Sequence, residues 1–162
     1  MRTPFRGKVV GIPRLKNTRG RCAGTQEEVK TLNLLAEHVS TRGWNVIFGK
    51  DEEDGITPAL RNIIINSSNS YKSQIFALLH EIGHLSVFSD PSYSEKYPDG
   101  YIRYAGKTTT RSRRHRFDVL REEIAAWDEA EKLVEHLGIS LNMRDMRDER
   151  NRSLMTYVEW LK

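Results

Sequence analysis

Apolar residues recur at helical spacing in four stretches of the chain. The first helix is predicted to begin at Thr25, because Thr25 and Glu28 form a capping-box pattern, and to end at Gly43. Three further stretches with the same periodicity predict helices over about residues 71–88, 117–137 and 142–161. The C-terminal half of the chain is therefore expected to be mainly helical.

Strands are predicted where β-branched and aromatic residues predominate, in residues 44–48 and 61–66, with a third, shorter strand in residues 8–12. An acidic loop separates the two longer strands. Residues 89–115 show no periodicity and predict a long irregular loop. This order of elements predicts an α+β fold with a short antiparallel or mixed sheet, in a single domain spanning residues 1–162.

Basic residues give the chain a net charge of +4 and are concentrated in residues 2–21 and 107–121. We expect residues 1–24 to form a basic N-terminal arm and residues 89–115 a basic loop. Such surfaces can bind nucleic acid or an acidic protein partner. Because aromatic residues do not alternate regularly with these charges and no recognisable nucleic-acid motif is present, a solvated basic surface is the simpler interpretation.

Apolar runs and cysteine content predict where in the cell the protein is located. No apolar run approaches the roughly 20 residues needed to cross a bilayer, and no apolar segment of a secretory signal follows the basic N-terminus. Cys22 is the single cysteine, so an internal disulfide is excluded. A reducing, cytoplasmic location is expected, with no membrane partner.

The chemistry of the chain is concentrated in His80-Glu81-Ile82-Gly83-His84, an H-E-x-x-H motif within the second predicted helix. Histidines four residues apart lie on the same face of a helix, so His80 and His84 can bind one metal ion. Glu81 is then placed to take a proton from a metal-bound water. The pattern predicts a catalytic Zn²⁺ site.

A catalytic zinc normally has three protein ligands, so a third is needed. Asp90 lies nearby in the sequence, but no glycine follows His84 at the spacing that would turn the chain back. On the next long helix Glu123 shares the apolar face, whereas Glu122 falls on a more polar, wetter face. A carboxylate on an apolar face is costly unless it is paired, so we predict Glu123 as the third ligand.

Other readings of these residues remain open. Glu123 could instead form a buried ion pair with one of the many arginines. His115 lies in the predicted basic loop and is a candidate substrate contact. His38 and His136 are expected to be surface or helix-cap residues. The oxyanion of the reaction could be stabilised by His115 or by a tyrosine of the 89–115 loop, from Tyr93, Tyr97, Tyr101 and Tyr104.

The strand ending at Asn66, followed by a helix carrying H-E-I-G-H, resembles the ImmA/IrrE-type zinc metallopeptidases, also called minigluzincins. In that family a later helix carries E-x-x-A-x-x-x-A, a spacing that Glu123, Ala126 and Ala130 match. The resemblance covers about residues 25–137 and implies a small zincin-like fold in bacterial, mobile-element or phage proteins. Glu129 departs from the family, which prefers an aromatic residue there, and no helix-turn-helix segment is present.

The resemblance implies a cytoplasmic zinc endopeptidase that hydrolyses a protein or peptide substrate, with narrow specificity. Two other functions fit the same residues. One is a zinc-containing binding module whose basic surfaces contact nucleic acid or a protein. The other is a protease that acts on DNA-associated proteins. The sequence leaves open the substrate, the cleavage site, the oligomeric state and any regulation.

Overall fold

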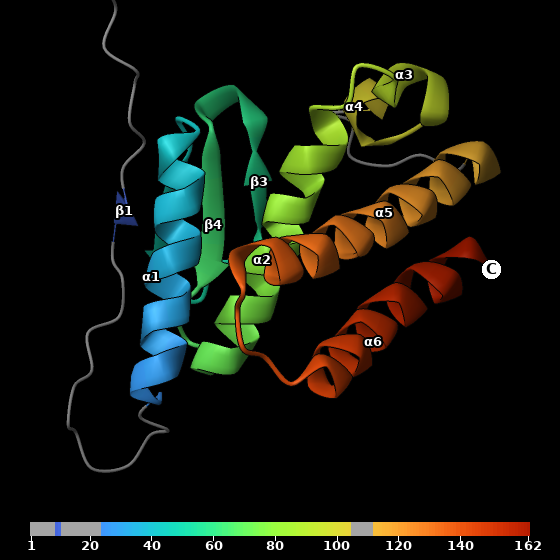
Figure 1. The fold of residues 1–162 in the computed structure, drawn as a ribbon. Coiled ribbons are helices and arrows are strands. Elements are labelled where there is room, and N and C mark those ends of the chain that lie inside the picture. Colours follow the sequence, from blue (N-terminus) through green and yellow to red (C-terminus); the bar gives the residue numbers. More distant parts are fainter. Residues whose placement is uncertain (1–8, 11–23, 105–111) are drawn as a thin grey trace, which may run out of the picture. The chain divides into compact units, whose positions relative to one another are not determined.

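A computed structural model describes residues 9–10, 24–104 and 112–162 (Figure 1). Two compact units, Met1–Glu81 and Ile82–Lys162, meet inside one continuous helix, α2 (Tyr71–Phe88), and are described separately below. The prediction of a single domain stays a prediction. No helix of the described residues has the length and apolar character needed to cross a membrane.

The first unit contains a mixed sheet with the strand order β1-β2-β4-β3. Its strands are β1 (Val9–Val10), β2 (Asn45–Gly49), β3 (Gly55–Thr57) and β4 (Asn62–Asn66). The pairs β1–β2 and β2–β4 are parallel, whereas β3 runs antiparallel to β4. The α+β class is therefore confirmed. The strand β3 lies where only a loop was expected after the acidic residues.

The core of this unit follows from strict alternation in β2 and β4. Val46 is in register with Ile63, and Phe48 with Ile65, and all four side chains are buried. Alternate residues of a strand point to opposite faces, so these pairs form one apolar face. The helix α1 (Gln26–Thr41) packs beside the sheet with a buried stripe (Figure 1): Leu32, Leu35, Ala36 and Val39.

The capping box predicted for α1 is confirmed. The Thr25 hydroxyl accepts the Glu28 amide at 3.2 Å, and the Glu28 carboxylate accepts the Thr25 amide at 2.7 Å. The two bonds satisfy two backbone donors that the start of a helix would otherwise leave to solvent.

Replacing Thr25 with alanine removes the acceptor at the start of α1. We expect Thr25→Ala to lower the free energy of unfolding by about 1 kcal/mol. Urea denaturation followed by circular dichroism measures this loss. Thr25→Ser is the matched control because it keeps the hydroxyl oxygen, and its stability should stay close to that of the wild type. Equal stability of the serine and alanine variants would contradict the capping role.

The described part of the second unit is helical and contains the end of α2 followed by four helices. These are α3 (Tyr93–Lys96), α4 (Tyr101–Tyr104), α5 (Arg113–Leu137) and α6 (Met143–Leu161). The prediction of an irregular segment over residues 89–115 is wrong where α3, α4 and the start of α5 lie, whereas residues 89–92 and 97–100 form turns or irregular backbone. Residues 105–111 of that segment lie outside the described residues, as does most of the predicted N-terminal arm.

Helix ends in this unit follow recognisable caps. The Ser112 side chain accepts the His115 amide, so α5 begins four residues before the predicted Phe117. Gly138 ends α5 in the left-handed conformation, with φ 61°, as expected from its position. α5 and α6 lie side by side (Figure 1) and are joined by Arg150, which forms ion pairs with Asp128 at 2.7 Å and Glu131 at 3.1 Å.

Candidate metal centre

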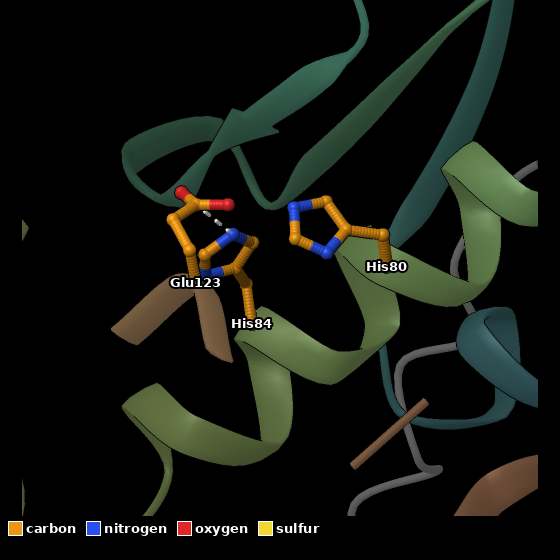
Figure 2. Close-up of side chains that lie close together, drawn as sticks. All are labelled: His80, His84 and Glu123. Atoms are coloured by element: carbon orange, nitrogen blue, oxygen red, sulfur yellow. Dashed lines mark ion pairs between the residues drawn. The ribbon is translucent and has the colours of Figure 1, made fainter. Parts of the chain in front are cut away.

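Helix α2 carries both histidines of the H-E-x-x-H motif. The helix has the predicted bounds, so His80 and His84 lie one turn apart on one face, as Figure 2 shows. The apolar stripe predicted for this helix is buried, which leaves a neighbouring face for the imidazoles: Ile75, Leu78, Leu79, Ile82 and Leu85. His84 is buried and its ring stacks on Phe88, with 5.5 Å between the ring centres.

Helix α5 supplies the carboxylate. Glu123 is 1% exposed, and its Oε1 lies 3.4 Å from Nε2 of His84 (Figure 2). Ligand atoms of His80, His84 and Glu123 all lie within 4.8 Å of one another. The structure therefore brings together the three residues that the sequence predicted as ligands.

The donor set and its spacing fit zinc. Two imidazole nitrogens and one carboxylate oxygen are a ligand set that catalytic zinc uses. Two ligand atoms that each lie about 2.1 Å from a tetrahedral zinc are about 3.4 Å apart. The separation of 3.4 Å between His84 and Glu123 agrees with this value. A simple His–Glu ion pair would show the same distance between His84 and Glu123. The presence of a third ligand residue, His80, within reach of both favours a metal site.

Glu123 reaches His84 because α5 passes very close to α2 at Gly83. A Cβ atom added to Gly83 would overlap the backbone carbonyl of Ala126, one turn beyond Glu123. Ala126 and Ala130 are fully buried, so α5 presents small side chains along this contact. The glycine of the motif and the alanines after Glu123 therefore allow the close approach that places the carboxylate beside His84.

Glu122 is also buried, and the prediction that it faces a wetter surface is wrong. Its side chain is 0% exposed and accepts hydrogen bonds from the Tyr93 hydroxyl and the Tyr101 amide, each at 2.8 Å. Burial raises the pKa of Glu122 to about 7, although both hydrogen bonds favour the ionised form. Gly100 lies so close to this carboxylate that an added Cβ would overlap it. Glu122 thus anchors the segment that carries α3 and α4.

Among the tyrosines of this segment whose side chains are described, Tyr101 contacts the predicted ligands. Its hydroxyl donates to Oε1 of Glu123 at 2.6 Å, and its ring meets the ring of His84 edge to face, with 6.0 Å between centres. Burial and the nearby Glu123 carboxylate raise the pKa of Tyr101, so the hydroxyl stays protonated. Of the other candidate tyrosines, Tyr93 is bonded to Glu122, and Tyr97 packs against Arg121.

The other residues considered as ligands or substrate contacts lie elsewhere. Asp90 follows α2, where it pairs with Lys96 and caps the next turn through Ser92, and these partners hold its pKa well below the usual range. His115 is buried in the first turn of α5, not in a loop, and its Nδ1 lies 2.6 Å from the carbonyl oxygen of Asp99. His38 lies in the last turn of α1 and His136 in the last turn of α5.

Two further acidic residues, Glu81 and Asp54, belong to the same unit as His80. Glu81, the predicted proton acceptor, follows it on α2 and is 8% exposed. Asp54, which the sequence marked only as part of an acidic loop, accepts the Asn66 amide at 2.6 Å. Burial raises the pKa of Asp54, while this hydrogen bond and the charge of His80 oppose the rise.

Comparisons with protein-family models, with curated proteins and with solved structures found no match to this chain. The functional interpretation therefore rests on the residues and their geometry.

Proposed function

We propose that this protein is a zinc-dependent metallopeptidase of the minigluzincin type, with a zincin-like fold. The observation that carries the proposal is the convergence of His80, His84 and Glu123, whose ligand atoms lie within 4.8 Å of one another. The two histidines belong to an H-E-x-x-H helix, and the glutamate comes from a later helix, as in the family that the sequence resembles. A site that only supported the fold would have no need of Glu81 between the histidines.

Bound zinc lowers the pKa of a coordinated water toward neutrality and polarises a carbonyl oxygen. Glu81 accepts a proton from the attacking water on its carboxylate and delivers it to the leaving amine. Glu81 is 8% exposed, so its side chain is largely shielded from bulk solvent. His80, His84 and Glu123 would hold the metal through two imidazole nitrogens and one carboxylate oxygen.

An extended peptide can bind at β3, the outermost strand beside β4 in the described sheet. A peptide that pairs with an edge strand gains main-chain hydrogen bonds without depending on its side chains. The strand β3 is short, Gly55–Thr57, so it would pair with only a few residues of such a peptide.

Zinc binding tests the proposal directly. The purified wild-type protein should bind one equivalent of zinc, as measured by elemental analysis and by competition with a chromophoric chelator. Glu123→Ala and His84→Ala each remove a ligand. We expect them to weaken zinc binding by more than the roughly 10–100-fold that loss of an outer-shell partner costs.

Glu129→Ala is the matched control, because Glu129 lies on the same helix and pairs with Lys132 at 2.6 Å. Its zinc affinity should equal that of the wild type. Circular dichroism separates two roles of the metal: zinc loss with the fold retained supports an active-site metal, whereas unfolding on zinc loss indicates a structural site. Failure of the wild-type protein to bind zinc would refute the proposal.

A further inference from the structure

Two consecutive glutamates of α5 accept hydrogen bonds from the backbone amide and the side-chain hydroxyl of one tyrosine. The Tyr101 amide donates to Oε1 of Glu122 at 2.8 Å, and the Tyr101 hydroxyl donates to Oε1 of Glu123 at 2.6 Å. Both carboxylates are almost completely buried. Since neighbouring residues of a helix point about 100° apart, the two glutamates can bind the backbone and the side chain of the same residue.

From this arrangement we infer that Tyr101 is a positioning residue for the metal ligand Glu123. The inference rests on the proposed zinc site. A glutamate side chain has several rotatable bonds, so without a partner its carboxylate can take several orientations before a metal binds. A hydroxyl bonded to one of its oxygens fixes that rotation, and hydrogen bonds between a hydroxyl and a carboxylate are among the strong ones in proteins. Fixing the orientation before the metal arrives lowers the entropy lost on binding.

Tyr101 also touches a second predicted ligand. Its ring meets the ring of His84 edge to face, so one side chain contacts both the nitrogen donor and the oxygen donor whose separation is 3.4 Å. The backbone of Tyr101 is fixed by Glu122, which is itself bonded to Tyr93. These hydrogen bonds fix the backbone around α4 and so restrict where the Tyr101 hydroxyl can lie.

Tyr101 also contacts the C-terminal helix, α6. The Tyr101 hydroxyl lies 3.3 Å from the hydroxyl of Tyr157 on α6, a longer and weaker hydrogen bond. The α6 helix is joined to α5 by the two ion pairs of Arg150. A chain of contacts thus runs from α6 through Tyr157 and Tyr101 to Glu123. This arrangement gives α6 a role at the metal site although it carries none of the ligands.

The test isolates the hydroxyl, because phenylalanine keeps the ring that packs on His84. Metal-free Tyr101→Phe is titrated with zinc in competition with a chromophoric chelator at fixed pH. We expect its zinc affinity to fall by about 10–100-fold, the usual effect of losing an outer-shell partner. Cobalt substitution supplies a second readout, since a reoriented carboxylate changes the visible spectrum of the bound ion. Tyr97→Phe, in the same segment but packed on Arg121, is the control and should bind zinc as the wild type does.

The zinc affinity of the variants decides whether the Tyr101 hydroxyl positions Glu123. Zinc affinity of Tyr101→Phe within about twofold of wild type, less than one typical hydrogen bond contributes, would overturn the positioning role while leaving the zinc site intact. A wild-type protein that binds no zinc would overturn the proposed function and this inference together. Should Tyr101→Phe fail to fold, Tyr157→Phe decides instead: a loss of about two- to tenfold supports the chain of contacts, and an unchanged affinity refutes it.

Discussion

The Glu81→Gln variant is expected to bind zinc as the wild type does and to lose peptide hydrolysis by about 10²–10⁴-fold. Glutamine has nearly the same shape as glutamate but cannot accept a proton at neutral pH, so the substitution removes proton transfer and leaves His80 and His84 in place. The measurement compares cleavage of a peptide library derived from host proteins, read by mass spectrometry, with zinc content determined on the same samples.

The control for this experiment is Glu135→Gln, an exposed glutamate near the end of α5. It should cleave the same peptides at the wild-type rate. Full activity of Glu81→Gln would show that another group accepts the proton and would refute the assigned mechanism. An inactive variant that retains zinc can also trap the natural substrate, since it binds peptides without cutting them. The proteins that co-purify with it then identify the target.

Helical periodicity correctly places Glu123 on the buried face of α5 but places Glu122 wrongly, and both results have the same physical reason. Glu123 is separated from Ala126 and Ala130 by three and seven residues, so it shares their buried face and could be chosen from the sequence. Glu122 was placed on a polar face by the same argument, yet it is fully buried. The segment around Tyr93 and Tyr101 covers it, and that cover arises from tertiary contacts that the periodicity of one helix does not report.

Element length explains which parts of the fold the sequence could predict. α1, α2 and α6 have 16, 18 and 19 residues, enough turns for an apolar period and its caps to be recognised. β3 has three residues and α3 and α4 have four each, which is less than two periods of any pattern. Their formation depends on partners such as β4 and Glu122. Tyr101 could therefore be named as a candidate from sequence, but its contact with Glu123 could not be predicted.

Gly83→Ala is expected to destabilise the protein, although alanine is the better helix former. In an exposed helix this substitution would stabilise by about 1 kcal/mol. At Gly83 the added methyl group would overlap the carbonyl of Ala126, a backbone atom that cannot move aside without shifting α5. Overpacking of this kind costs about 1–3 kcal/mol, so the unfavourable contact should outweigh the gain in helix propensity.

The free energy of unfolding, measured by urea denaturation of the metal-free protein, decides the sign for Gly83→Ala. Gly55→Ala is the control, because among the described residues no atom beyond Gly55 and its two chain neighbours lies within 4 Å of the added methyl group. Its stability should change by less than about 0.5 kcal/mol. A shift of α5 would also carry Glu123 away from His84, so zinc affinity should fall together with stability in Gly83→Ala. If Gly83→Ala were more stable than the wild type, the gain in helix propensity would outweigh the contact with Ala126. In that case α5 would not pass as close to α2 as the metal site requires.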